Sequence, residues 1–189
     1  MIEINNWHIR NDNPVNWRIE DQELLVQVSE GNIWGAGSSE VDNMFIHPTK
    51  PDSVKEKGNF SAQVAINLTP KRTYEQGGLG IIWDTDNYIK ISKEMFNGKL
   101  SLVFVIEKDG HPSIQQLIDY SKDDVVVKIE KRDNLVTASY AESVGGKWTV
   151  VGTADALGGE EEGLMLYTFG GSKMAPSTAR FSNFVLASN

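Results

Sequence analysis

The sequence of 189 residues contains no cysteine, and this absence removes three kinds of chemistry at once. Without cysteine the chain has no disulfide, no thiol nucleophile and no thiolate ligand for a metal. The N-terminal stretch MIEINNWHIR lacks the basic and apolar segments of a signal peptide. No apolar run reaches the length of a transmembrane helix. These absences predict a cytoplasmic protein.

Basic residues are also in short supply. Lysine and arginine together number 18, against 26 aspartates and glutamates, so the formal net charge is −8 at pH 7. Binding to nucleic acid or to anionic lipid needs a cluster of basic side chains, and the sequence has no such stripe. We therefore expect neither nucleic acid nor a membrane as partner.

Helical periodicity is missing almost throughout. Only short helical turns are expected, near Ser53 to Lys57 or Asp155 to Leu157. Instead, short runs of β-branched and aromatic residues alternate with turn residues, which is typical of strands. Strands are predicted at 17–19, 23–28, 60–68, 77–83, 88–93, 99–107, 114–120, 125–131, 135–143, 148–152, 163–169 and 179–187.

Many antiparallel strands without helices predict an all-β fold, namely a two-sheet antiparallel β-sandwich or jelly roll. The sequence has no linker and no internal repeat, so residues 1–189 are predicted to form one domain. The segment from Gly35 to Gly58 is expected to be a long loop. Loops of that length in a compact domain are often functional.

The stretch QGGLGIIWDTDNYIKISKE (76–94) predicts a hairpin closed by a four-residue turn, DTDN, with Trp83 opposite Tyr88. Together with a two-residue turn at Asn97-Gly98, this register sorts the strands into two faces. The face predicted to be buried carries Ile82, Ile89, Ile91, Leu100, Leu102, Phe104 and Ile106, with Gly78 and Gly80 leaving room for side chains of the opposing sheet. The face predicted to be partly exposed carries Leu79, Ile81, Trp83, Tyr88, Lys90, Ser92, Glu94, Ser101, Val103, Val105 and Glu107.

A sheet face that mixes aromatic with charged residues is typical of a saccharide-binding surface. Sugar rings stack their C–H faces on tryptophan or tyrosine, and their hydroxyl groups bind charged or amide side chains. The alternative interpretation is an ordinary solvent-facing sheet with a few cross-strand pairs.

Catalytic motifs are scarce. His8, His47 and His111 are far apart and lack the spacing of metal ligands, so a zinc site is not expected. The DTDN turn has part of a calcium-loop pattern but lacks the final acidic ligand. Glycoside hydrolysis needs two carboxylates in one cleft, and Glu94 and Glu107 are the one pair predicted to share the exposed face.

Five stretches, taken in order, carry a family resemblance: NPVNWRIEDQELLVQVSEGNIW, QGGLGIIWDTDNYIKISKE, YAESVGGKWTVVG, GLMLYTFGG and ARFSNFVL. Their succession between Trp7 and Leu186 is similar to the concanavalin A-like domains of the regulation-of-enolase type. It also resembles the C-terminal sandwich domain of family-43 β-xylosidases. The sequence departs from this pattern at Gly77, where alanine is usual, and at 21–23 and 144–146, where an Asp-Gly turn is expected.

The resemblance implies a concanavalin A-like jelly roll whose concave sheet is able to hold a saccharide. It implies no known reaction and no cofactor. A structural calcium occurs in some relatives, but no ligands for it are assigned in this sequence. The ligand-binding residues that it implies by motif are Trp34, Trp83, Tyr88, Lys90 and Glu94. We add Glu107 because it is predicted to share their face.

Three hypotheses of function follow. The first is a non-catalytic, lectin-like protein that binds carbohydrate on the concave face. The second is a glycoside hydrolase with Glu94 and Glu107 as acid and base. The third is an interaction or regulatory protein, in which the same face holds another protein or forms a homodimer.

Overall fold

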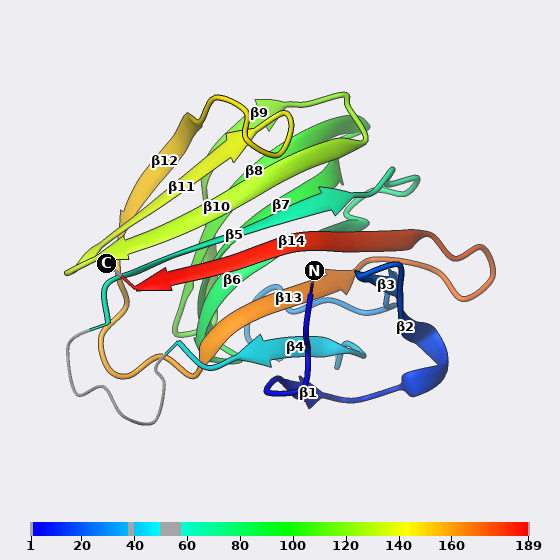
Figure 1. Cartoon of the computed structure of the whole chain (residues 1–189), viewed down its shortest axis with the longest axis horizontal. Helices are drawn as coiled ribbons and strands as arrows, with labels where there is room; N and C mark the ends of the chain where they lie inside the picture. The colour runs from blue at the N-terminus through cyan, green and yellow to red at the C-terminus, as the bar shows by residue number, and fades with distance from the viewer. Residues whose placement is uncertain (1, 38–39, 50–57, 189) are drawn as a thin grey trace.

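The structure is a computed structural model that describes residues 2–37, 40–49 and 58–188 (Figure 1). Within these ranges it contains fourteen strands and one short 3₁₀-helix, η1 (Pro14–Asn16). The strands are β1 (His8–Arg10), β2 (Trp17–Glu20), β3 (Glu23–Gln27), β4 (Met44–His47), β5 (Phe60–Asn67), β6 (Gln76–Asp84), β7 (Asn87–Phe96), β8 (Lys99–Lys108), β9 (His111–Asp119), β10 (Asp124–Arg132), β11 (Leu135–Ala141), β12 (Thr149–Asp155), β13 (Gly163–Phe169) and β14 (Thr178–Ser188).

The strands form two seven-stranded sheets, which we name sheet A and sheet B. Sheet A has the order β1-β4-β13-β6-β7-β8-β9, and sheet B has the order β12-β11-β10-β5-β14-β3-β2. Neighbouring strands are antiparallel throughout both sheets. The two sheets pack face to face, so the predicted all-β sandwich is confirmed (Figure 1).

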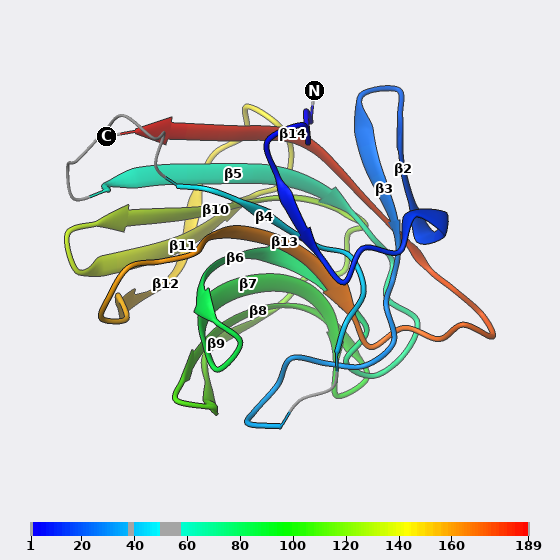
Figure 2. The same cartoon turned by 90° about the horizontal axis from the view of Figure 1, so that it is seen from below.

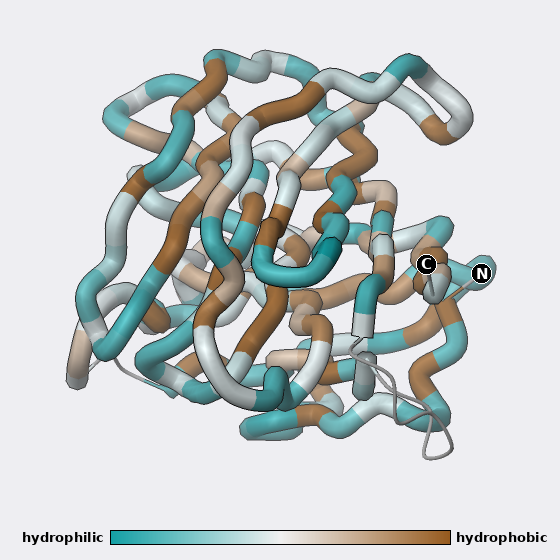
Figure 3. Tube along the Cα trace, turned by 90° about the vertical axis from the view of Figure 1, so that its left-hand side faces the viewer, coloured by the Kyte–Doolittle hydropathy of each residue, from teal (hydrophilic) through white to brown (hydrophobic). Residues whose placement is uncertain are grey.

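The core between the sheets follows from the alternation of side chains along each strand. In β5, Phe60, Ala62, Val64 and Ile66 are buried and the residues between them are partly exposed. Figure 3 shows the same alternation as changes of colour along the strands. Sheet A contributes inward-facing residues of β6, β7 and β8, namely Leu79, Ile81, Ile89, Ile91, Leu102 and Phe104.

Sheet A is curved, and its outer face is concave. Figure 2 shows β6, β7 and β8 bending together, with the segment between β3 and β4 crossing their concave side. The concave face therefore has a cover of its own, which builds a second apolar cluster outside the sandwich core. This cover decides which polar residues of sheet A are reached by solvent.

Two strands and one helical turn differ from the sequence predictions. β1 was not predicted, and β4 lies inside the segment from Gly35 to Gly58 that was expected to be a loop. Both are short and pair with each other at the edge of sheet A, so neither shows a long alternating pattern. The turn expected at Asp155 to Leu157 is not helical, because β12 runs to Asp155 and irregular chain follows. The turn expected at Ser53 to Lys57 lies outside the described residues.

No described helix is long and apolar enough to cross a membrane.

The register of β7 with β8 is confirmed, but the register of β6 with β7 is wrong by one residue. Asn97 and Gly98 form the predicted two-residue turn, with φ angles of 49° and 78° and Phe96 opposite Lys99. At the other turn Asp84 pairs with Asn87 and Ile82 pairs with Tyr88, so Trp83 is the extra residue of a β-bulge.

This bulge exchanges the two faces of β6. Leu79, Ile81 and Trp83 face the core between the sheets, and Ile82 lies on the concave face with Tyr88. Gly78 and Gly80 also lie on that face, directly opposite Tyr167 and Met165 of β13. The two glycines therefore make room for side chains of a neighbouring strand in the same sheet, and not for the opposing sheet as predicted.

Candidate functional site

A row of polar side chains runs along the concave face of β7. Tyr88, Lys90, Ser92 and Glu94 point to this face, and Glu107 of β8 lies beside Tyr88. The predicted sharing of one face is therefore confirmed for these five residues. All five are buried, however, with Glu94 the most accessible at 4%. The prediction that this face is partly exposed is wrong for this row.

The segment after β3 covers one end of the row. The hydroxyl group of Tyr88 lies 2.5 Å from a carboxylate oxygen of Glu107 and 3.0 Å from the carbonyl oxygen of Ile33. The backbone N–H of Gly35 donates to the same carboxylate at 3.0 Å. Glu107 is thus enclosed by the covering segment, and it holds that segment against the sheet.

The other end of the row opens into a pocket of about 490 Å³. Its rim carries two exposed rings, Trp34 at 42% and Tyr74 at 51% exposure, and the exposed aliphatic side chain of Ile114 at 39%. Phe96 and Phe169 complete the apolar wall, and Gln76 and Glu94 supply polar groups. The remaining lining residues are Gly31, Asn32, Thr73 and Gly170.

A chain of hydrogen bonds connects the buried row to the rim. The ammonium group of Lys90 donates to the side-chain oxygen of Gln76 at 2.7 Å, and the amide nitrogen of Gln76 donates to the carbonyl oxygen of Tyr74 at 3.1 Å. The same ammonium lies 5.5 Å from the ring centre of Tyr167 and 5.4 Å from that of Phe169. Gln76 is therefore fixed in orientation from both sides.

Glu94 is the acidic group of the pocket. Its Oε2 accepts a hydrogen bond from the hydroxyl group of Ser92 at 3.1 Å, and no other described residue donates to the carboxylate. Burial raises the pKa of Glu94, against the opposing effects of Lys90 and of the Ser92 hydrogen bond. Burial lowers the pKa of Lys90 to about 8, although Glu94 and Glu107 both favour its charged form.

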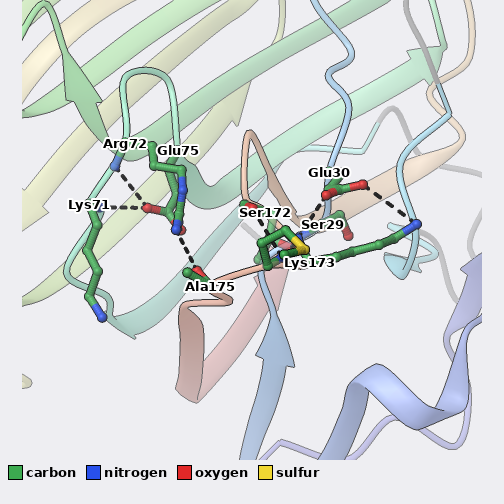
Figure 4. Close-up of polar contacts among 10 residues, drawn as sticks. Ser29, Glu30, Lys71, Arg72, Glu75, Ser172, Lys173 and Ala175 are labelled. Carbon is green, nitrogen blue, oxygen red and sulfur yellow. Dashed lines mark hydrogen bonds and ion pairs between the residues drawn. The ribbon is translucent and has the colours of Figure 1, made fainter.

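Three loops form one wall of the pocket, and they are tied to one another (Figure 4). The carboxylate of Glu75 accepts hydrogen bonds from the backbone N–H groups of Lys71 at 2.6 Å and Arg72 at 3.1 Å. The guanidinium group of Arg72 donates to the carbonyl oxygen of Ala175 at 2.7 Å, which joins the loop before β6 to the loop after β13.

The loop after β13 is joined in turn to the segment after β3. Lys173 contacts Glu30 through its backbone N–H at 2.8 Å and through its ammonium group at 3.6 Å (Figure 4). The backbone N–H groups of Gly170 and Gly171 donate to Gly31 at 3.1 Å and Ser29 at 2.8 Å. The wall is thus held by backbone bonds and two ion pairs.

Tyr74 is placed at the rim by an unusual backbone conformation. Its φ angle is +68°, a region that costs free energy for a bulky residue. The backbone N–H donates to Met95 at 2.7 Å, and the ring meets Phe96 edge-on with 5.9 Å between ring centres. The neighbouring bonds of Glu75 and Gln76 hold the conformation. Strain of this kind is often found at binding sites.

The structure places the predicted site residues in three different settings. Trp34 and Glu94 line the pocket, and Lys90 lies directly behind it. Tyr88 and Glu107 are enclosed under the covering segment. Trp83 packs against the core between the sheets, so the expectation that it shares a face with Tyr88 is wrong.

Glu94 and Glu107 are not brought together. Glu94 pairs with Ser101, and Glu107 lies six positions farther along β8 (107 − 101 = 6). At about 3.3 Å per residue their Cα atoms are roughly 20 Å apart, and Lys90 and Ser92 lie between them on the same face. His8 and His47 lie on the paired strands β1 and β4, and His111 begins β9. The described residues contain no group of three or more acidic or histidine side chains that could hold a metal.

Of the eleven lining residues, sequence reasoning found only Trp34 and Glu94, and it missed Tyr74, Gln76, Phe96 and Phe169 among the others. Gln76 carried a signal, since a polar residue at the start of an apolar strand next to paired glycines needs a hydrogen-bond partner. The others lie at strand ends or in loops that meet only in the folded chain.

Comparison with known proteins assigns the chain to a family. A family model described as "Protein of unknown function (DUF1349)" matches residues 11–186. No curated protein matches the chain. A functionally unknown protein from Saccharomyces cerevisiae is 16% identical, with a TM-score of 0.75, and the match covers 100% of this chain and 99% of that one.

Two other solved structures have a similar fold. A GH43 protein from Bacillus licheniformis is 17% identical with a TM-score of 0.78, and the match covers 97% of this chain but only 37% of that one. The carbohydrate binding module CBM66 from Bacillus subtilis is 15% identical with a TM-score of 0.60, and the match covers 98% of both chains. At these identities the likeness shows a shared β-sandwich fold.

Proposed function

The chain belongs to the DUF1349 family, whose description names no activity, and from its pocket we propose that it binds saccharides without catalysis. The observation that carries the proposal is the combination of two exposed rings, Trp34 and Tyr74, with the buried polar groups of Gln76 and Glu94 in one pocket. We also propose that residues 1–189 form one sandwich domain. Cytoplasmic location and likeness to the regulation-of-enolase type stay predictions from the sequence.

The chemistry of the pocket suits a sugar ring. Aromatic rings accept the apolar C–H face of a sugar, and a small number of fixed polar groups select the hydroxyl pattern. The pocket volume of about 490 Å³ lies within the range of small-molecule sites. The binding groups are also preorganised before a ligand arrives. Gln76 is hydrogen-bonded to both Lys90 and Tyr74, and the backbone conformation of Tyr74 fixes the position of its ring. Rigid sites lose less entropy when a ligand binds.

The site differs from the one predicted from sequence. Trp34 and Glu94 are kept, Lys90 acts through Gln76, and Tyr74 takes the stacking role that was predicted for Trp83. Relatives of the same fold support this use of the sandwich, since one is a carbohydrate binding module and another is a GH43 protein. The enclosure of Glu107 under the covering segment argues against the hydrolase hypothesis.

A glycan array followed by titration calorimetry tests the proposal. We expect binding to at least one plant, bacterial or storage glycan, and a loss of about tenfold or more in affinity for Trp34→Ala and for Tyr74→Ala, about 1.4 kcal/mol each. Trp148→Ala is the matched control, because Trp148 lies before β12, stacks under Lys128 at 4.4 Å and does not line the pocket. Absence of binding to every glycan class would overturn the proposal.

A second candidate function is docking of a protein, including a second copy of this chain. It is favoured by the exposed edge strand β9, where Ile114 and Leu117 are 39% and 41% exposed beside the pocket. Edge strands with exposed apolar residues are ready to pair with another chain. Size-exclusion chromatography with light scattering distinguishes the two, since a dimer that Leu117→Lys converts to monomer would favour docking over saccharide binding.

A further inference from the structure

We propose that the ligand of this pocket is an uncharged saccharide, held by hydroxyl donation to Glu94, and that saccharides carrying carboxylate or sulfate groups are rejected. This inference rests on the proposed saccharide binding and adds the charge class of the ligand. It follows from the distribution of charged groups around the pocket rather than from its shape.

The pocket offers one charged group to a ligand. Among the described residues that line it, Glu94 is the one with a formal charge at pH 7, and none is lysine, arginine or histidine. Recognition of carboxylate or sulfate groups in proteins relies on arginine or lysine as donors. A second anion near Glu94 would instead face like-charge repulsion in a partly desolvated site.

The cation closest to this site is turned away from the ligand. Lys90 is fully buried, its ammonium group bonds to Gln76, and the rings of Tyr167 and Phe169 flank it. Its charge offsets that of Glu94 within the protein, so the pair does not leave a surplus positive charge for the pocket. A ligand carboxylate would have to displace Gln76 to reach it.

Arg72 and Lys173 of the loop wall are engaged as well, and Lys71, the third cation of these loops, does not line the pocket. Arg72 contacts Glu75 at 3.5 Å and the carbonyl oxygen of Ala175 at 2.7 Å, and Lys173 contacts Glu30 at 3.6 Å (Figure 4). Neither residue lines the pocket. The wall therefore presents backbone and aromatic surface to the ligand, and its ion pairs serve to hold the loops.

Glu94 has acceptor capacity that the protein does not use. Its Oε2 accepts from Ser92, and no described residue donates to Oε1. An ionised carboxylate only accepts hydrogen bonds, so its natural complement is a group that donates, such as a sugar hydroxyl. Two adjacent hydroxyl groups on one ring match the two oxygens of a carboxylate, and such charge-assisted bonds are stronger than neutral ones.

The test uses pairs of soluble oligosaccharides that differ only at C6, where a CH₂OH group is replaced by a carboxylate. The probes are fragments of β-1,4-mannan and β-1,4-polymannuronate, and of β-1,4-glucan and β-1,4-polyglucuronate, titrated calorimetrically into the full chain. We expect any pair that binds to favour the neutral member by about tenfold or more. Equal or tighter binding of a uronate would overturn the inference while leaving saccharide binding intact. Absence of all binding, here and on the array, would overturn both.

A variant of Glu94 tests whether this residue causes the selectivity. Glu94→Gln removes the charge and keeps the shape, so we expect weaker binding of the neutral probe and a smaller ratio between neutral and anionic members. Glu20→Gln is the matched control, because Glu20 pairs with Arg18 on sheet B and lies outside the pocket and its wall. Thermal unfolding checks that both variants are folded. An unchanged ratio in folded Glu94→Gln would contradict the assigned role.

Discussion

The ammonium group of Lys90 donates a hydrogen bond to the side-chain oxygen of Gln76, 2.7 Å away, between neighbouring strands of sheet A. The lysine is fully buried, and burial lowers its pKa from 10.5 to about 8. The folded chain therefore binds fewer protons than the unfolded chain between pH 8 and pH 10.5. Its unfolding free energy rises with pH across this window, because the cost of the buried charge is full below pH 8 and disappears above pH 10.5.

We predict that Lys90→Met removes this rise, which for Lys90 is on the order of 3 kcal/mol between pH 8 and pH 10.5. Denaturant unfolding at several pH values measures it. Lys93, whose pKa burial also lowers to about 8, contributes in the same direction and is left in place. Lys99→Met is the control, since Lys99 forms only an exposed ion pair with Asp119. An unaltered pH slope in Lys90→Met would show that the ammonium is already hydrated.

The positive φ angle of Tyr74 predicts an inverted order of stability between two small substitutions. Alanine is normally more stable than glycine in an ordered chain, by roughly 0.5–1 kcal/mol. At φ +68° the Cβ atom is the source of strain, so Tyr74→Gly should be more stable than Tyr74→Ala by about 1 kcal/mol. Both lose the ring, and both should lose glycan affinity equally. Urea unfolding compares them, and a more stable alanine variant would contradict the strain.

Glu75 is predicted to hold the loop before β6. Its buried carboxylate accepts two backbone N–H groups, so Glu75→Ala leaves two donors without their partner. We expect a loss of roughly 2–4 kcal/mol in unfolding free energy, together with weaker glycan binding because Tyr74 is adjacent. Glu30→Ala, at a more exposed carboxylate in the same wall, should cost less than about 1 kcal/mol. Equal costs would mean that the buried carboxylate is not the anchor.

Gly78 and Gly77 form a matched pair on opposite faces of β6. A Cβ atom on Gly78 would lie 2.3 Å from the carbonyl oxygen of Ile91 and 2.5 Å from the hydroxyl of Tyr167. A Cβ atom on Gly77 would meet its first neighbour, the flexible side chain of Leu68, at 3.3 Å. Gly78→Ala should therefore cost about 3 kcal/mol and Gly77→Ala less than about 1 kcal/mol, as measured by thermal unfolding. If Gly77→Ala cost more stability than Gly78→Ala, the assignment of β6 faces predicted from sequence would be supported instead.

The sandwich was predictable from sequence because most of its strands carry a two-residue alternation and are bounded by turn residues. The faces of β7 and β8 were predictable for a further reason, since Asn97-Gly98 allows little choice of register. The face of β6 was not. Whether the turn takes in Trp83 or leaves it as a bulge depends on how the indole packs against the sandwich core, which the local sequence does not encode.

The candidate site was predictable only where it lies on strands. Glu94 and Lys90 follow from the alternation of β7, but their burial depends on a segment more than fifty residues earlier (90 − 33 = 57) that contains Ile33. Tyr74 is brought to the pocket by its backbone bond to Met95 of β7, and Phe169 by the pairing of β13 with β6. Contacts of that range have no periodic pattern, so sequence reasoning selected Trp83, an aromatic residue on the same hairpin.

The loops that make the pocket wall are bonded mainly to one another, while the strands beneath them are bonded as an ordinary sheet. The wall is therefore transferable as a set. If residues 29–32, 70–75 and 170–175 were moved together into another sandwich of this type, the hydrogen bonds and ion pairs that connect these loops would be kept. Moved singly, each loop would leave Arg72 or Glu30 without its counterpart. Ligand preference within this fold would then change by exchange of three short segments, with the two sheets left as they are.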